Sequence, residues 1–231
     1  MASKDILNKY ATEIRNENLD MFKPDNKTFL MFINYNCGGY LGQAVINDGV
    51  YFASHLHTLY KCYYISNSSV NTAKELIKKL VSSKGEHVIY YSGHGTQVKD
   101  YNGDETDGRD EAFVFKNGYL VDDEAANILN NNFACDKLIL FADCCHCGTI
   151  WDLNAVKNNI KDKITCISAC DDNQTSKQLF KNGCFTLQFW RLYDMKTKTI
   201  NINELNNKLK IFDQTAIIYP MTNKENFKIL F

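Results

Sequence analysis

Short apolar runs alternate with helix-forming segments along most of this chain. Helices are predicted in six segments, and Ile6, Tyr10 and Ile14, four residues apart, form the apolar face of the first. These segments are 2–17, 48–60, 73–81, 123–131, 185–193 and 202–209. Continuous apolar runs predict buried strands at 29–33, 62–65, 87–91, 112–115, 138–142, 164–169 and 215–219. The alternation favours an α/β fold, with a mostly parallel central sheet and helices on both faces.

Two polar segments interrupt this pattern. Residues 99–110 hold no strand signal and are rich in acidic side chains, so they predict a loop. Residues 154–163 are rich in Asn and Lys and indicate a linker or an exposed loop. At 231 residues the chain suits a single domain, 1–231, with the linker dividing it into parts 1–153 and 164–231.

Composition narrows the class of protein. The net charge of −1 gives no electrostatic reason to expect nucleic acid or an anionic membrane as a partner. The first residues lack the apolar segment of a signal peptide, and the longest apolar runs are too short to span a membrane. Nine cysteines, an odd number, without a secretory signal indicate reduced thiols. We therefore expect a cytoplasmic protein.

Two glycine-containing motifs follow predicted strands. His94 lies in Tyr-Ser-Gly-His-Gly after the run 87–91, and Cys145 lies in Asp-Cys-Cys-His-Cys-Gly after the run 138–142. Ligands of open α/β sheets bind where strands end, so the two side chains are candidates for a base and a nucleophile. The N–H groups of Gly95 and Cys145 are candidates for an oxyanion hole. A core histidine and a structural cysteine are the alternative, which two glycine-flanked strand ends disfavour.

Neighbouring residues leave two further alternatives. Position alone does not separate Cys144 from Cys145 as the nucleophile. A zinc site made of Cys144, Cys145, His146 and Cys147 is disfavoured, because four adjacent residues cannot surround one tetrahedral ion.

Together these motifs resemble those of the metacaspases, which are caspase-fold cysteine peptidases. The 51 positions from His94 to Cys145 also match the separation of roughly 50 residues in caspases. Further matching segments follow in the family's order: 34–35, 46–48, 103–111, 122–124 and 168–175. The resemblance covers about residues 28–230 and implies a caspase-like fold in a compact form without a long prodomain, and a monomer. It also implies Cys145 as nucleophile, His94 as acid and base, and parts 1–153 and 164–231 that correspond to large and small subunits.

The resemblance implies an acidic pocket for the substrate side chain P1, which precedes the cleaved bond. Its residues would be Asp143, Asp48 and Ser92, which would bind Arg or Lys and repel Asp. Asp48 is also a candidate cap for a helix that begins there. Two positions depart from the family: Val45 replaces a small polar residue near the pocket, and Cys147 stands where Ser is frequent.

The acidic residues of the predicted loop are a further candidate for function. By composition alone, Asp104, Glu105, Asp107, Asp110 and Glu111 form a solvated loop, and the glycine spacing of an EF-hand is missing. Hard cations such as Ca²⁺ are the alternative, since they bind carboxylate oxygens. The resemblance implies Ca²⁺ as cofactor, with four aspartates as ligands: Asp110, Asp122, Asp123 and Asp152.

The sequence thus predicts a calcium-stimulated cysteine endopeptidase that cleaves protein substrates after Arg or Lys. Self-cleavage at Lys157, Lys161 or Lys163 is a further hypothesis. One alternative is a caspase-fold peptidase with another P1 preference and no need for calcium. The other is a caspase-fold binding module without catalysis.

Overall fold

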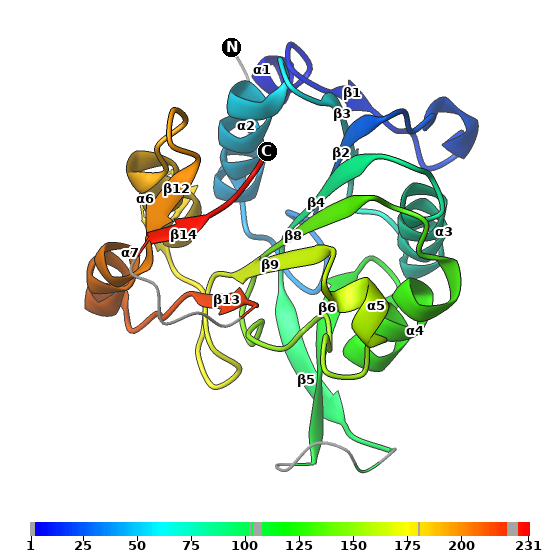
Figure 1. Cartoon of the computed structure of the whole chain (residues 1–231). Helices are drawn as coiled ribbons and strands as arrows, with labels where there is room; N and C mark the ends of the chain where they lie inside the picture. Colours follow the sequence, from blue (N-terminus) through cyan, green and yellow to red (C-terminus); the bar gives the residue numbers. More distant parts are fainter. Residues whose placement is uncertain (1–2, 102, 104–107, 180, 221–225) are drawn as a thin grey trace.

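Seven strands form a central sheet with helices on both faces (Figure 1). The structure is a computed structural model that describes residues 3–101, 103, 108–179, 181–220 and 226–231. The order in the sheet is β1-β3-β2-β4-β8-β9-β13, and all neighbours are parallel except the pair β9 and β13. The bounds are β1 Thr12–Glu13, β2 Lys27–Ile33, β3 Lys61–Ser66, β4 Glu86–Ser92, β8 Lys137–Asp143, β9 Ile164–Ser168 and β13 Ile217–Tyr219.

Helices α1 and α2, with α6 and α7, lie on one face of the sheet, and α3, α4 and α5 lie on the other (Figure 1). Strands β2, β4 and β8 are buried along almost their whole length, which explains their continuous apolar sequences. The helix bounds are α1 Ser3–Leu7, α2 Gln43–Leu56, α3 Val70–Val81, α4 Asp122–Asn132, α5 Asn158–Lys161, α6 Cys184–Leu192 and α7 Ile202–Leu209, with short 3₁₀ helices at Leu19–Met21 and Lys210–Phe212.

Smaller sheets surround the central one. A three-stranded antiparallel sheet projects from the end of β4, at the bottom of Figure 1, and consists of β5 Gly95–Lys99, β6 Arg109–Phe115 and β7 Gly118–Val121. Two pairs lie in the C-terminal part: β10 Gln178–Leu179 with β11 Asn182–Gly183, and β12 Thr199–Asn201 with β14 Asn226–Lys228.

The predicted fold class is confirmed, and the central strands lie where the apolar runs predicted them. The helix predicted over 2–17 is wrong beyond Leu7, because Thr12 and Glu13 pair with β3. The extended backbone there still buries Ile14, which the sequence pattern had assigned to a helical face. Helix α2 begins at Gln43, five residues before the predicted start.

The two polar segments differ from expectation. Lys99, Arg109 and Asp110 belong to β5 and β6, whereas Asp104, Glu105 and Asp107 lie outside the described residues. Segment 154–163 contains the helix α5, whose Ile160 is buried against the core, so it is only partly an exposed loop.

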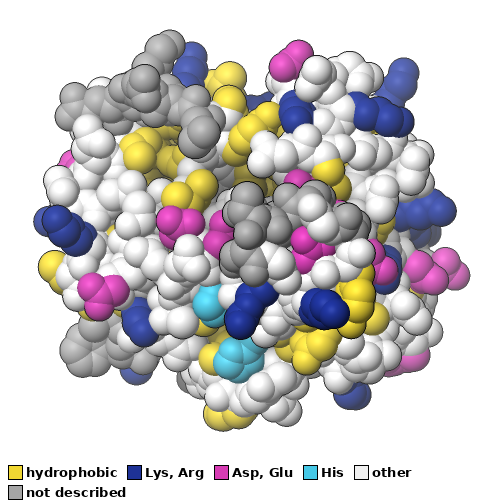
Figure 2. Space-filling model, turned by 90° about the horizontal axis from the view of Figure 1, so that it is seen from below, with side chains coloured by type: hydrophobic (Ala, Val, Ile, Leu, Met, Phe, Trp, Pro, Cys, Tyr) yellow, Lys and Arg dark blue, Asp and Glu magenta, His cyan; other side chains and the backbone are white. Residues whose placement is uncertain are grey.

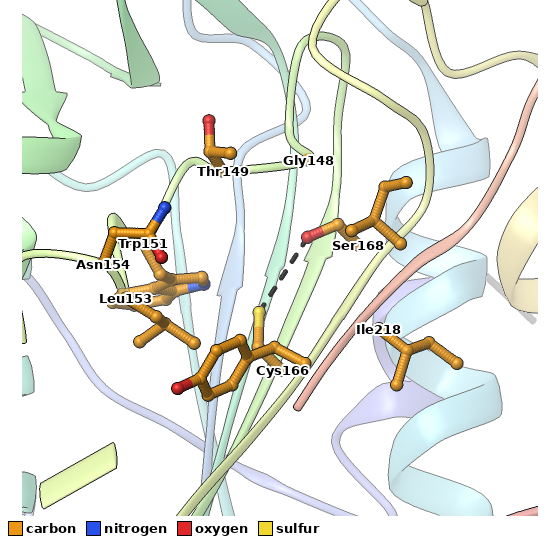
Figure 3. A pocket seen from close by; sticks show the side chains of 10 residues that line it. Gly148, Thr149, Trp151, Leu153, Asn154, Cys166, Ser168 and Ile218 are labelled. Carbon is orange, nitrogen blue, oxygen red and sulfur yellow. Dashed lines mark hydrogen bonds between the residues drawn. The ribbon is translucent and has the colours of Figure 1, made fainter. Parts of the chain in front are cut away.

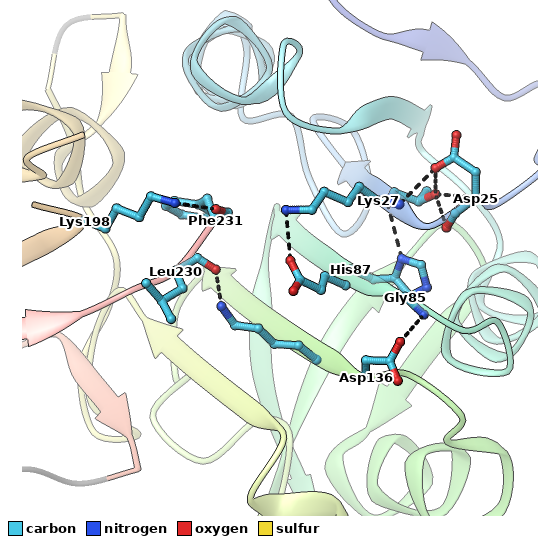
Figure 4. A network of polar contacts seen from close by, with 11 residues as sticks. Asp25, Lys27, Gly85, His87, Asp136, Lys198, Leu230 and Phe231 are labelled. Carbon is cyan, nitrogen blue, oxygen red and sulfur yellow. Dashed lines mark hydrogen bonds and ion pairs between the residues drawn. The ribbon is translucent and has the colours of Figure 1, made fainter. Parts of the chain in front are cut away.

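A polar network closes the sheet at the edge where the strands begin (Figure 4). Lys27 forms an ion pair with Glu86 at 2.9 Å, and the backbone N–H of Gly85 donates to Asp136 at 3.1 Å. The ammonium groups of Lys137 and Lys198 donate to the carbonyls of Leu230 and Phe231. The contact of Lys137, the first residue of β8, ties the C-terminal segment to the sheet at the edge opposite the predicted catalytic residues.

Within the described part of the chain, every helix is too short or too polar to cross a lipid bilayer.

Candidate active site

The predicted catalytic residues meet at one edge of the sheet. Strands β4 and β8 are parallel neighbours, with Ser92 opposite Asp143 in their last positions. His94 follows β4 by two residues and Cys145 follows β8 by two, so both emerge at the same strand ends. Both line one pocket of about 220 Å³. Acidic and histidine side chains gather on the face from which the β5–β6 hairpin projects (Figure 2).

Cys145 is the accessible cysteine of its motif. Its side chain is half-buried, whereas Cys144 and Cys147 are 1% and 0% exposed. The next residue, His146, has a left-handed φ of +50°, and its backbone N–H donates to the carbonyl of Gln174 at 2.9 Å. This sharp turn presents Cys145 to the pocket. Burial raises the pKa of the Cys145 thiol, so the thiol is protonated in the free protein at neutral pH.

The imidazole of His94 packs against the backbone of the loop that contains Gly39. A Cβ atom on Gly39 would lie 3.2 Å from Nε2 of His94, so the backbone at Gly39 packs closely against the ring. Burial lowers the pKa of His94, and a hydrogen bond to the Gly39 backbone opposes that effect. The free site therefore holds a neutral thiol and a neutral imidazole, and the thiol proton must move during attack.

Gly95 allows the two strand ends to approach each other. A Cβ atom on Gly95 would overlap the carbonyl oxygen of Cys145, so no other residue fits there. The Val114 N–H donates to the His94 carbonyl, which makes Gly95 and Phe113 a pair without mutual hydrogen bonds. The Gly95 N–H is thus directed away from β6 and is not used in the β5–β6 ladder.

Two buried carboxylates line the same pocket. Asp143 is 5% exposed and accepts hydrogen bonds from Ser176 at 3.0 Å and from Thr186 at 2.7 Å. Asp48 is 2% exposed and accepts from the side chain of Asn182 at 3.0 Å and from the N–H of Gly183 at 2.9 and 3.0 Å. A Cβ atom on Gly183 would lie within 3.0 Å of both carboxylates, so this glycine separates them.

Burial raises the pKa of both Asp48 and Asp143, and the charge of Asp143 raises that of Asp48 further. Lys177 also lines the pocket, but its ammonium donates to the Thr175 hydroxyl at 2.6 Å rather than to a carboxylate. A cationic group placed between the carboxylates would relieve their repulsion and favour the charged form of each.

The structure corrects the alternative role of Asp48. Because α2 begins at Gln43, Asp48 lies inside the helix and does not cap it. Val45 lines the pocket as the sequence comparison with the family suggested. Cys147 lies behind the site instead, with its sulfur 3.7 Å from that of Cys170, so its difference from Ser does not alter the pocket wall.

Sequence reasoning missed the residues that hold the carboxylates. Ser176 lies in an irregular segment and Asn182 and Gly183 form the short strand β11, and their partners became visible only in the fold. Thr186 left one signal, since it is a polar residue in the otherwise apolar start of α6 and is fully buried. It links Asp143 to the hydroxyl of Tyr90, 3.1 Å away.

Three of the four predicted calcium ligands, Asp110, Asp122 and Asp123, interact where β6 lies beside the start of α4. Burial raises the pKa of Asp122 to about 8, and the charge of Asp110, which is buried on β6, contributes to the rise. Asp122 accepts from the N–H groups of Asp123 at 2.8 Å and Glu111 at 3.1 Å. Asp152, with φ +36°, accepts from the N–H of Ala155 at 3.2 Å.

Among the described residues, no three His, Cys, Asp or Glu side chains are grouped as metal ligands. The calcium requirement stays a prediction.

Comparisons with known proteins relate the chain to one family of peptidases. Residues 65–154 match the family model of the metacaspase, peptidase C14 domain. Metacaspase-3 of Arabidopsis thaliana is 35% identical in an alignment of 114 positions that covers 38% of this chain and 32% of that protein. Metacaspase-1 of the same plant is 30% identical in an alignment of 155 positions that covers 53% of this chain and 42% of that protein. Over these segments the chain is similar to metacaspases. It matches less than half the length of these curated relatives.

Solved structures support the fold of this metacaspase-like chain. A protein from Geobacter sulfurreducens superposes with a TM-score of 0.60 at 22% identity, over 87% of this chain and 97% of that one. Caspase-1 from Spodoptera frugiperda superposes with a TM-score of 0.53 at 10% identity, over 89% and 92%. At these identities the likeness concerns the fold alone.

Proposed function

We propose that this metacaspase-like protein is a cysteine endopeptidase that cleaves peptide bonds after Arg or Lys. The observation that carries the proposal is the single pocket lined by His94, Cys145, Asp48 and Asp143. Two buried carboxylates with raised pKa values favour a cationic P1 side chain, because its charge stabilises both in the ionised form. An anionic P1 side chain would add a third negative charge.

The proposed reaction starts from the neutral Cys145 thiol and the neutral His94 imidazole. His94 takes the proton of the Cys145 thiol as the sulfur attacks the carbonyl carbon of the P1 residue, and an S–C bond forms. The N–H groups of Gly95 and Cys145 would donate to the oxyanion. His94 then gives its proton to the leaving amine, and the C–N bond breaks. Water, deprotonated by His94, hydrolyses the thioester and restores the thiol.

Hydrolysis of fluorogenic peptides ending in Arg, Lys or Asp tests this function, with Cys145→Ala as the blank. Turnover of Arg and Lys peptides, at least 100-fold faster than that of the Asp peptide and lost in the variant, is the expected result. Turnover of Asp peptides instead would favour another caspase-fold specificity. An intact Cys145→Ala protein that keeps the activity would refute the mechanism.

Calcium stimulation is a separate part of the proposal, supported by the resemblance and by the buried Asp110 and Asp122. When bound, the ion would neutralise carboxylates beside the β5–β6 hairpin. Titration with Ca²⁺ in the same assay is expected to raise turnover, and Asp122→Asn is expected to weaken the response. Equal turnover in Ca²⁺ and in chelator would contradict this part while leaving the peptidase proposal intact.

A further inference from the structure

A second pocket lies beside the turn that follows the nucleophile. It has a volume of about 220 Å³ and shares no lining residue with the catalytic pocket. Trp151, Leu153, Cys166, Ser168 and Ile218 form much of its wall (Figure 3). Among the residues that the structure describes, no Asp, Glu, Lys or Arg side chain lines it. The pocket therefore offers no charge to a charged ligand.

One polar group in the wall has no hydrogen-bond partner among the residues that the structure describes. Trp151 is 2% exposed, and its indole Nε1 is buried without a hydrogen bond. Figure 3 shows the indole along one side of the pocket, with its nitrogen directed into the space that Cys166 and Ser168 face. Because Nε1 is itself buried, an acceptor reaches it with a small rotation of the indole. A buried N–H without an acceptor costs about 1–3 kcal/mol, so the acceptor is then bound favourably.

We propose that this pocket binds a small, neutral, largely apolar molecule that carries one hydrogen-bond acceptor for Trp151. A cavity of about 150 Å³ holds benzene, so a volume of about 220 Å³ suits a bicyclic compound. The ring system would pack against Leu153, Cys166 and Ile218, and a carbonyl or ether oxygen would accept from Nε1 of Trp151. The site is independent of the proposed peptidase chemistry.

The chain contains two tryptophans, which allows a direct test by ¹H–¹⁵N NMR of the indole N–H groups. Trp190 is an internal control, because its Nε1 is also buried without a partner but it does not line this pocket. The probe is 1-tetralone, and tetralin, the hydrocarbon without the carbonyl, is its matched control. Trp151→Phe assigns the two signals.

Saturable movement of the Trp151 signal to lower field with 1-tetralone, while the Trp190 signal stays in place, is the expected result. Tetralin is expected to bind about fivefold more weakly, without that movement. Ile218→Phe, which fills the pocket, is expected to weaken 1-tetralone at least tenfold, whereas Ile211→Phe at a side chain 77% exposed leaves it unchanged. An unmoved Trp151 signal up to the solubility of the probe, or equal movement of both signals, would overturn the proposal.

Discussion

Asp48 and Asp143 face each other across Gly183 with almost no access to solvent. Carboxylates in such a position lose hydration, and each disfavours the ionisation of the other. Hydroxyl and N–H donors from Ser176, Thr186 and Gly183 offset part of this cost. In the proposed function, a cationic substrate side chain that enters between them would recover the remaining cost.

Replacing one carboxylate should weaken the recognition of basic substrates. Asp143→Asn keeps the size of the side chain, and its partners Ser176 and Thr186 are hydroxyls that can donate or accept. We expect kcat/KM for Arg peptides to fall about 100-fold, about 3 kcal/mol, because one partner of a buried charge pair is lost. Asp136→Asn, at the opposite edge of the sheet, is the control. A loss below threefold in Asp143→Asn would contradict the assigned pocket.

The pH dependence should follow the same two groups. Their pKa values are raised, so protonation as pH falls removes the negative charge that holds a cationic P1 side chain, and kcat/KM declines. Burial lowers the pKa of His94, so His94 is protonated below its ordinary range, and its protonation reduces kcat/KM only at a lower pH. In Asp143→Asn the pKa of Asp48 falls, and the acid limb measured with an Arg peptide should move to lower pH. An acid limb that stays at the same pH in Asp143→Asn would assign the decline in kcat/KM to another group.

At the scale of elements, the ends of β4 and β8 determine the site. Their pairing fixes Ser92 beside Asp143, and the close approach of Gly95 to the backbone of Cys145 joins the hairpin β5–β6 to the turn of the nucleophile. Cys145 is thus held by contacts between backbones, which tolerate no added side chain.

Gly95→Ala should abolish activity through this contact. The added methyl group would overlap the Cys145 carbonyl and displace the turn, and we expect kcat/KM for Arg peptides to fall at least 1,000-fold. Gly108→Ala is the control: it meets no atom within 4 Å and, at φ +75°, carries only a backbone penalty of about 1–2 kcal/mol. Melting curves report folding in both variants, and an active Gly95→Ala protein would contradict the geometry.

The elements differ in how far the sequence predicts them. Continuous apolar runs identified β2, β4 and β8, because almost every side chain is buried in a strand that is covered on both faces. Short strands such as β1 and β5 were missed, since their conformation comes from pairing with distant residues and not from their own composition. Likewise, the sequence does not assign Thr186 and Gly183 to the site, because their hydrogen bonds to Asp143 and Asp48 join residues far apart in the chain.

At the scale of the molecule, one sheet joins both parts of the chain. The segment that connects them, 154–163, is anchored by α5: Ile160 is buried and Lys157 donates to the Asn130 carbonyl at 3.1 Å. A peptide bond must become extended to enter a peptidase site, so cleavage in this segment requires local opening.

Self-cleavage should therefore be slow and confined to the lysines of this segment. We expect intact-mass analysis to detect products ending at Lys157, Lys161 or Lys163, and their loss when all three are replaced by Gln. Lys208→Gln/Lys210→Gln, at exposed positions of the C-terminal part, is the matched control. Cleavage at the same place in the triple variant would refute the hypothesis.

Covalent labelling with a peptidyl arginyl chloromethyl ketone tests whether Cys145 is the nucleophile and lies beside a pocket for a basic side chain. We expect one adduct, in which the sulfur of Cys145 replaces chloride, although the chain has nine cysteines. The reaction should slow strongly in His94→Ala and with the aspartyl analogue of the reagent. Labelling of another cysteine, or equal rates for the arginyl and aspartyl reagents, would contradict the assignment of nucleophile and pocket.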